Sequence, residues 1–359
     1  MKIHEKKQPL ISICIPAFNR PKHIIDLLKS VDCLPDEIEI VICEDHSPDR
    51  KKIREAVNTF KKSSLYNIEY FENPDNFGFD GNIRELVNRA SGKFLVYMGD
   101  DDLFIQGALE KYIAFLKDNM SMSYVLRSYI SKLSGHAIEK FHYLPKTTIL
   151  EPGEKTVAWL FKRSVVLCGF TISREEALKY NTAELDGTLL YQVYLMSCVC
   201  LNKSSIYCDI PIAEVGMVFE DNSMFGTSKA EREKYSKGTI TDSNSINFTK
   251  SYFEVTNYID RLYDVNITGN VRESLSKFSY PFLAIQRKRG LMAFLRYSKR
   301  LESECGLGVT HYFAIYKWSL SIFGESFCNR AIRVIKKFYK HTPNLYTTKG
   351  SGLYFCTLR

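Results

Sequence analysis

The sequence predicts an α/β protein in which helices flank a mainly parallel β-sheet, with a helical extension at the C-terminus. Residues 9–120 alternate short β-rich apolar runs with segments whose apolar side chains recur at helical spacing. Strands separated by such helices are joined by right-handed crossovers, which make neighbouring strands parallel. Beyond residue 250, aromatic and basic segments keep helical spacing, as at Phe323, Phe327 and Phe338.

The first 120 residues are expected to contain four strands and three helices. Each strand is a short apolar run that ends at a polar turn, and Gly92 stops the third helix. The expected strands are residues 10–15, 38–43, 68–72 and 94–98, and the expected helices are residues 21–31, 48–62 and 83–90.

Polar clusters follow three of these strands, at residues 16–20, 44–49 and 100–102. The carboxyl ends of parallel strands lie at one edge of a sheet, and ligands bind outside that edge. We therefore expect three separate regions of the sequence to form one site.

Residues 121–240 mix strand and helix patterns, with a strand expected over 165–173 and a helix over 188–201. We interpret them as the second half of the same domain. The domain then covers residues 1–240, and a basic, aromatic helical region covers residues 241–359.

The composition fits a globular protein without a secretion signal or a membrane span. Apolar residues make up 45% and charged residues 25% of the chain, which argues against extended disorder. The N-terminus lacks a signal-peptide core, and the longest apolar stretches, such as 189–201 and 309–323, fall short of the roughly 20 residues that span a bilayer. The ten cysteines show no paired CxxC spacing, which favours reduced, buried thiols over a zinc site. We expect a cytoplasmic protein.

Positive charge is concentrated near the C-terminus. Residues 270–349 contain 15 Lys and Arg against 4 Asp and Glu, whereas the rest of the chain has a net charge of −3. Basic side chains such as Arg287 and Lys288 interleave with Phe294 and Tyr297, a mixture suited to an anionic membrane surface. A solvated basic face on a helical bundle is an equal alternative.

Asp100, Asp101 and Asp102 are three consecutive carboxylates at the end of a strand. Like charges this close repel one another unless a cation or an ionised partner compensates them. Mg²⁺ and Mn²⁺ prefer carboxylate oxygen and can bridge to the diphosphate of a nucleotide. The cluster therefore indicates a site for Mn²⁺ or Mg²⁺, with a solvated acidic turn or a helix cap as the alternative.

Five short motifs occur in a fixed order within residues 9–120. They are ICIPAFNR at 13–20, ICEDHSPD at 42–49, NFG at 76–78, ASGKF at 90–94 and GDDDL at 99–103. In this order and spacing they resemble family 2 glycosyltransferases of the GT-A fold. The N-terminal half is similar to the abequosyltransferase-like branch, which builds bacterial surface polysaccharide.

The resemblance implies that residues 1–120 bind a nucleotide-sugar donor and that residues 121–240 bind the acceptor. Pro16, Ala17 and Phe18 would line the nucleoside. The resemblance also implies roles for polar residues: Asp45 would accept a hydrogen bond from the base, Asp100 would contact the ribose, Asp101 would bind the metal, and Asp102 would be a second ligand, direct or through water.

Further residues are assigned to the nucleotide-sugar site from the same motifs. Gly169 resembles a position where the backbone approaches the donor sugar, with a bulge glycine as the alternative. The other assigned residues are Arg20, Glu44, Asn76, Gly78 and Asn82.

The sequence departs from the family pattern at three positions. Glu44 stands where many members have Asp, and His46 where Gly is usual. Gly99 stands where the first acidic residue of a DxD motif often lies, which leaves open which two of the three aspartates hold the ion.

Family 2 enzymes invert the anomeric centre, which needs a carboxylate to take the proton of the acceptor hydroxyl. In the family this base precedes a helix in the acceptor half. Asp186 is the candidate here because it lies just ahead of the apolar run 189–201, and Glu184 is the alternative. Asp186 also fits a purely structural role as the N-cap of that helix.

A mobile loop and a lipid-linked acceptor complete the expectations. Residues 220–238 are polar and contain Gly226 and Gly238, which fits a mobile loop, and residues 215–228 could close over the donor to exclude water. A lipid-linked saccharide acceptor would suit peripheral attachment of the basic C-terminal region to the inner face of the cell membrane. No nucleic-acid partner is expected.

Two other functions are weighed against glycosyl transfer. A sugar-phosphate nucleotidyltransferase also holds a metal with aspartates, but it needs a glycine-rich phosphate loop after the first strand, and residues 16–20 contain no glycine. A non-catalytic membrane-associated scaffold with the same fold is the second alternative, against which the intact acidic cluster argues.

Overall fold

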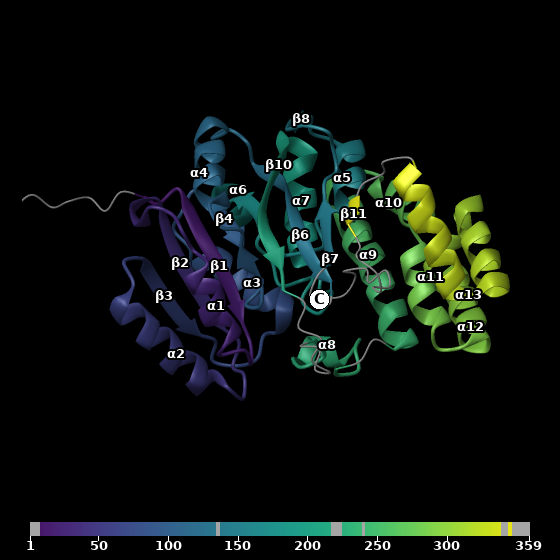
Figure 1. Ribbon diagram of the computed structural model, residues 1–359, viewed down its shortest axis with the longest axis horizontal. Coiled ribbons are helices and arrows are strands. Elements are labelled where there is room, and N and C mark those ends of the chain that lie inside the picture. Colours follow the sequence, from purple (N-terminus) through teal and green to yellow (C-terminus); the bar gives the residue numbers. More distant parts are fainter. Residues whose placement is uncertain (1–7, 134–136, 217–224, 239–240, 339–343, 347–359) are drawn as a thin grey trace, which may run out of the picture.

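The computed structural model describes residues 8–133, 137–216, 225–238, 241–338 and 344–346. Within these residues, 11 strands form one mixed sheet with helices on both faces (Figure 1). The main strand order is β11-β7-β6-β9-β4-β1-β2-β3, and β10 pairs with β6 beside this path. The expected fold class, a largely parallel sheet flanked by helices with a helical C-terminal region, is confirmed.

The first half of the chain supplies four parallel strands. β1 pairs with β2 on one side and β4 on the other, and β2 pairs with β3. All the strands and helices expected in this half are present. They are β1 Ile11–Ala17, α1 His23–Lys29, the 3-10 helix η1 Pro35–Glu37, β2 Ile38–Glu44, α2 Arg50–Ser63, β3 Asn67–Glu72, α3 Gly78–Arg89 and β4 Phe94–Tyr97.

The second half adds strands of both directions. β9 runs antiparallel between β4 and β6, whereas β10 runs parallel to β6. The elements are β5 Leu103–Phe104, α4 Ala108–Asp118, β6 Tyr124–Leu133, β7 Ala137–Phe141, β8 Thr148–Leu150, α5 Glu154–Phe161, β9 Phe170–Ser173, α6 Arg174–Lys179, α7 Tyr191–Asn202 and β10 Ser205–Val215.

The strand expected over residues 165–173 begins only at Phe170. The preceding residues form a loop because their carbonyl groups bind a side chain instead of a neighbouring strand. The buried guanidinium of Arg127 donates to the carbonyls of Cys168 (2.7 Å) and Val166 (2.5 Å).

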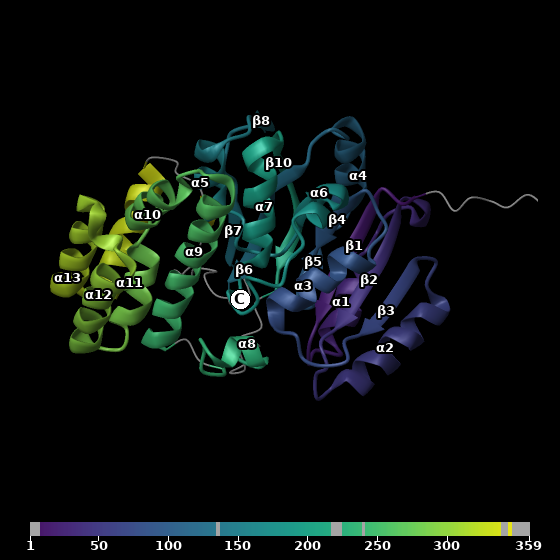
Figure 2. The ribbon, with the colours of Figure 1, turned by 180° about the vertical axis from the view of Figure 1, so that it is seen from behind.

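Alternate side chains of the parallel strands face two separate cores, as the two-residue period of a strand requires. Ile11, Ile13 and Ile15 of β1 pack in one core with α1, α2 and α4, whereas Cys14 belongs to the other core with α3 and α7. The helices of both cores are visible on the two sides of the sheet in Figure 2.

Glu39 fixes the amino ends of three strands. Its carboxylate accepts hydrogen bonds from Ser12 Oγ (2.6 Å) on β1, from the N–H of Ser91 (2.6 Å) and from the N–H of Gly92 (3.2 Å), which precede β4. Glu39 lies on β2 and is 6% exposed, so these bonds replace the hydration that the carboxylate loses. The register of β1, β2 and β4 is thereby fixed, and with it the position of their carboxyl ends.

Among the described residues, the C-terminal region is helical except for β11, which pairs antiparallel with β7 and was not anticipated by the sequence analysis. None of the described helices is long and apolar enough to cross a lipid bilayer. The elements are α8 Lys229–Arg232, α9 Asp242–Tyr263, α10 Ile267–Lys277, α11 Tyr280–Arg287, α12 Leu291–Cys305, the 3-10 helix η2 Leu307–Val309, α13 His311–Phe338 and β11 Asn344–Tyr346.

Candidate functional site

The turns after β1, β2 and β4 contact one another at the carboxyl edge of the sheet. The N–H of Asp45, after β2, donates to the carbonyl of Ala17 at the end of β1 (3.1 Å). The N–H of Phe18, which follows Ala17, donates to the carboxylate of Asp100 after β4 (3.0 Å). The structure thus brings together the three polar clusters found in the sequence.

Arg20 compensates the acidic cluster. Its Nη1 lies 2.8 Å from Asp100 Oδ1 and 3.2 Å from Asp101 Oδ1, and both carboxylate side chains are 6% exposed. Burial raises the pKa of Asp100 to about 6, and the charge of Arg20 opposes that rise. The ionised partner that three neighbouring aspartates require is therefore present in the chain itself.

Asp102 has a structural role. Its carboxylate accepts a hydrogen bond from the N–H of Gly99 (2.9 Å), which closes the turn after β4. The other oxygen accepts from the N–H of Gly216 (2.9 Å), just after β10. A Cβ atom at position 216 would lie 1.7 Å from the carbonyl oxygen of Asp101, so only glycine fits here. Asp102 therefore holds the end of β10 against the acidic turn.

Among the residues that the structure describes, no three His, Cys, Asp or Glu side chains are arranged as a metal site. Both oxygens of Asp100 and both oxygens of Asp102 accept hydrogen bonds from the chain. Mg²⁺ in nucleotide sites is commonly held by one or two carboxylates together with substrate phosphates. Asp101 is a carboxylate that could supply such a ligand, although its Oδ1 also lies 3.2 Å from Arg20, and metal binding by Asp100, Asp101 and Asp102 stays a prediction.

Asp45 organises the start of α3. Its carboxylate accepts hydrogen bonds from Asn73 Nδ2 (2.8 Å), the N–H of Phe77 (2.9 Å) and the N–H of Gly78 (2.8 Å). Burial raises the pKa of Asp45 to about 6, and these hydrogen bonds oppose the rise. Asn82, on α3, accepts from Asn73 (3.3 Å) and donates to the carbonyl of Cys43 (3.0 Å). Asp45 and Asn82 therefore hold the loop after β3, and their contact with a nucleotide stays a prediction.

The other residues assigned to nucleotide-sugar binding in the first half lie along the same edge. Ala17 is buried in β1, whereas Pro16 and Phe18 are half-buried. Glu44 is fully buried and accepts a hydrogen bond from the N–H of Ser47 (3.1 Å), so the glutamate that departs from the family pattern closes the turn after β2.

Residues 225–235, within the stretch that the sequence analysis expected to be a mobile loop, pack on the start of α3. Glu231 accepts a hydrogen bond from the N–H of Phe79 (2.8 Å), and Asn76 Nδ2 donates to Thr227 Oγ1 (3.2 Å). A Cβ atom on Gly78, whose φ is +77°, would lie 2.4 Å from Ser228 Oγ. Residues 225–235 are thus fixed against the edge.

The contacts just described concern only residues 225–235 of the mobile loop that was expected over residues 215–238. Residues 217–224 lie outside the described residues. Ser228 and Glu231 form a reciprocal capping box at the start of α8, a Ser-x-x-Glu pattern that could have been found in the sequence.

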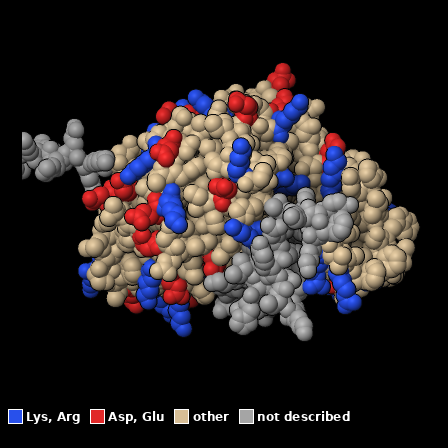
Figure 3. Space-filling view, turned by 45° about the horizontal axis from the view of Figure 1, so that its top comes forward, with Lys and Arg blue, Asp and Glu red and all other residues tan. Residues whose placement is uncertain are grey.

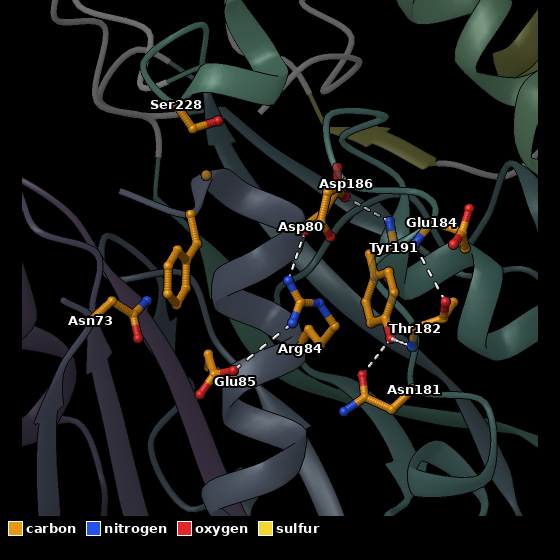
Figure 4. Close-up of polar contacts among 12 residues, drawn as sticks. Asn73, Asp80, Arg84, Glu85, Asn181, Thr182, Glu184, Asp186, Tyr191 and Ser228 are labelled. Atoms are coloured by element: carbon orange, nitrogen blue, oxygen red, sulfur yellow. Dashed lines mark hydrogen bonds and ion pairs between the residues drawn. The ribbon is translucent and has the colours of Figure 1, made fainter. Parts of the chain in front are cut away.

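Asp80 is a buried carboxylate of α3 that the sequence analysis missed. It accepts hydrogen bonds from the N–H groups of Leu189 (2.7 Å) and Tyr191 (2.9 Å), at the start of α7 (Figure 4). Burial raises the pKa of Asp80 to about 7, and these two bonds oppose the rise. Asp80 thereby caps α7 from a different helix, which no local pattern reveals.

Asp186 lies over the first turns of α3 in the turn that precedes α7. Arg84 Nη2 donates to Asp186 Oδ2 (2.7 Å), whereas Asp186 Oδ1 has no hydrogen-bond partner. Burial raises the pKa of Asp186, and the hydrogen bond and charge of Arg84 oppose the rise. The alternative base, Glu184, lies on the exposed side of the same turn (Figure 4).

Gly169 adopts φ +71° just before β9. A Cβ atom there would lie 2.8 Å from Ile212 Cδ1 and 3.3 Å from Arg127 Cγ. Its N–H donates to the carbonyl of Tyr97 at the end of β4 (2.8 Å). Close packing and left-handed backbone account for this glycine, and its approach to a donor sugar stays a prediction.

Comparison with known proteins shows what this region is similar to. Residues 12–180, slightly less than half of the chain, match the family model described as glycosyl transferase family 2. The matched range includes the turns after β1, β2 and β4, whereas Asp186 and the segment that carries Glu231 lie beyond it.

The curated relatives of this chain are distant. The GalNAc(5)-diNAcBac-PP-undecaprenol β-1,3-glucosyltransferase of Campylobacter jejuni is 28% identical over 37% of this chain and 42% of that protein. An abequosyltransferase of Salmonella typhimurium is 31% identical over 28% of this chain and 30% of that protein. The alignments span less than half of either relative, and similarity to both leaves the branch within family 2 a prediction.

One solved structure has similarity over most of the chain. It is a mannosyltransferase from Pyrobaculum calidifontis in complex with GDP-Man and Mn²⁺. The sequence identity is 12% and the TM-score is 0.48, with 93% of this chain and 88% of that chain covered.

Replacing Asp80 with alanine is expected to lower the free energy of unfolding by ~1–3 kcal/mol, because two N–H groups at the start of α7 lose a buried acceptor. The loss should be larger at pH 5 than at pH 8. A carboxylate whose pKa rises from 3.8 to about 7 on folding stabilises the fold at low pH, and this contribution disappears as the pH rises to about 7. Urea unfolding at both pH values measures the difference, and equal losses would contradict the raised pKa.

Proposed function

We propose that this chain is an inverting glycosyltransferase that moves a sugar from a nucleotide-sugar donor to a saccharide acceptor hydroxyl during bacterial glycan synthesis. The observation that carries the proposal is that the polar turns after β1, β2 and β4 meet at one sheet edge inside the region matched by family 2. The two named curated relatives are a glucosyltransferase and an abequosyltransferase, which supports glycosyl transfer as the reaction class.

The donor would bind at the carboxyl edge of the sheet. Pro16, Ala17 and Phe18 would line the nucleoside, beside Asp45 and Asp100. A divalent ion held by Asp101 and the donor phosphates would stabilise the negative charge that develops on the departing diphosphate. Arg20, already bound to Asp100 and Asp101, adds a positive charge at the same place.

Asp186 would act as the general base. Its Oδ2 is held by Arg84, which fixes the direction of the carboxylate, and its Oδ1 has no internal hydrogen bond to give up. The side chain as a whole is 21% exposed, but Oδ1 is buried, so an acceptor hydroxyl would have to displace part of this turn to reach that oxygen. Transfer of the hydroxyl proton to the carboxylate would activate the acceptor for attack on the anomeric carbon.

The acceptor would be a saccharide carried on a lipid diphosphate. The Campylobacter relative is named for an acceptor of this kind, an undecaprenol-linked saccharide. The sheet edge beside Asp186 would then receive the sugar end of the acceptor.

Replacing Asp186 with asparagine should reduce the rate of sugar transfer by roughly 10²–10⁴-fold, because asparagine cannot take the proton. Asparagine can still accept the hydrogen bond from Arg84, so the fold should be unaffected. Glu184→Gln is the matched control in the same turn and should retain the wild-type rate. A loss in the control with activity retained in Asp186→Asn would identify Glu184 as the base.

Replacing Arg84 with glutamine should shift the acidic limb of the pH profile of kcat/KM to higher pH. Arg84 lowers the pKa of Asp186, so its removal raises that pKa, and the base becomes deprotonated only at higher pH. Transfer rates measured from pH 5 to 9 give both profiles. Superimposable profiles would show that Asp186 does not titrate in the rate-limiting step.

Binding of the donor can be tested by the melting temperature of the protein with UDP-, GDP-, CDP- and dTDP-sugars in the presence of Mn²⁺, Mg²⁺ or EDTA. A ligand at 100 times its Kd stabilises the native state by about 2.7 kcal/mol. One nucleotide class should raise the melting temperature, more with metal than with EDTA, and Asp101→Asn should remove the metal-dependent part. Equal shifts in metal and in EDTA would argue against an ion between Asp101 and the donor.

A further inference from the structure

α13 carries a row of exposed apolar side chains at the end of the molecule opposite the nucleotide half (Figure 1). Ile315, Trp318 and Ile322 recur at intervals of three and four residues, so they lie on one face of the helix. They are 53%, 63% and 69% exposed. Phe323 and Phe327, on either side of the break at Gly324, pack with tilted rings whose centroids are 5.2 Å apart, and they are 56% and 57% exposed.

We call Ile315, Trp318, Ile322, Phe323 and Phe327 the α13 apolar face. Single exposed apolar residues are normal on protein surfaces, but a contiguous group that contains several aromatic rings marks an interaction surface. The charge around the face indicates which partner it fits.

The turn between α11 and α12 extends this surface. Arg287 Nε donates to the carbonyl of Leu320 (3.0 Å), and Lys288 Nζ lies 3.6 Å from Glu325 Oε1. These contacts place the end of α11 beside the break in α13. Met292, which follows this turn, is 70% exposed.

The helices around the α13 apolar face carry an excess of positive charge, and their acidic residues are paired with basic ones. Residues 280–335 contain nine Lys and Arg against three Glu. Glu302 pairs with Lys317 (2.9 Å), Glu304 with Arg300 (2.6 Å) and Glu325 with Lys288 (3.6 Å). Other exposed bases of α12 and α13 are Arg296, Lys299 and Arg330. Figure 3 shows this end of the molecule as a largely uncharged surface with Lys and Arg toward its lower rim.

We propose that the α13 apolar face docks on the surface of an anionic lipid bilayer. An amphipathic helix binds in the interface plane when aromatic and aliphatic side chains enter the acyl boundary and basic side chains meet anionic headgroups. A second copy of this chain is a poorer partner, because it would bring an equal excess of positive charge to the contact. Trp and Tyr rings favour the boundary between acyl chains and headgroups, which suits Trp318 and the 40% exposed Tyr312.

The docking does not depend on the proposed reaction, and it can be tested without donor or acceptor. The full chain is mixed with vesicles of phosphatidylglycerol and phosphatidylcholine, or of phosphatidylcholine alone, and bound protein is measured by co-sedimentation. The wild type should bind the anionic vesicles, and binding should weaken at high salt because the headgroup attraction is screened.

Two variants separate the apolar and basic contributions. Ile315→Ser, Trp318→Ser and Ile322→Ser combined should weaken binding by at least about tenfold. Arg296→Glu and Arg330→Glu combined should weaken binding to anionic vesicles by at least about 25-fold, since each lost charge is worth about fivefold. The matched control combines Leu65→Ser, Ile149→Ser and Leu262→Ser, which are 86%, 55% and 52% exposed elsewhere on the protein, and it should bind like the wild type.

A spectroscopic readout distinguishes insertion from simple charge adsorption. The chain has two tryptophans, so Trp159→Phe leaves Trp318 as the single reporter. Its emission should shift to shorter wavelength on anionic vesicles and be quenched by brominated acyl chains. The proposal would be overturned by unchanged emission, or by vesicle binding that the combined Ile315→Ser, Trp318→Ser and Ile322→Ser variant retains. It would also be overturned if that variant lost a dimer without any effect on vesicle binding.

Discussion

The candidate site depends on one electrostatic constraint: carboxylates that fold into the edge of a sheet lose their hydration and must receive hydrogen bonds from the surrounding chain. Asp45 receives them from the start of α3, Asp100 from the turn after β1, and Asp102 from the residue after β10. Most of these donors are backbone N–H groups of residues distant in sequence. The acidic side chains therefore position the loops around them, and the geometry of the edge follows from satisfying buried charge.

α3 connects the two halves of the domain through the same kind of interaction. Its first turns contact Asp45 from the first half and Glu231 from the segment after β10. On the other side of the helix, Asp80 caps α7 and Arg84 holds Asp186. A displacement of α3 would thus move the candidate base and the candidate nucleotide site together, which gives one helix control over the relative placement of both.

The sequence predicted the parts of this structure that rest on local pattern. Strands β1 to β4, their helices and the convergence of polar turns follow from residue periodicity and the parallel connection rule. The ion pairs of Arg20, the cap supplied by Asp80 and the docking of Glu231 join residues far apart in the chain, so no window of sequence contains them. The residues before β9 were predicted to be strand because they are apolar. Nothing in that local pattern indicates that Arg127, about 40 residues earlier, binds their carbonyl groups.

The short strand β11 closes one side of the sheet. Asn344–Tyr346 pairs with β7, so the backbone groups on that side of β7 bind another part of the same chain. An unpaired edge strand is a template for association between molecules. β11 therefore covers this edge of β7, and removing residues 344–346 would leave the backbone groups of β7 open to pairing with a strand of another molecule.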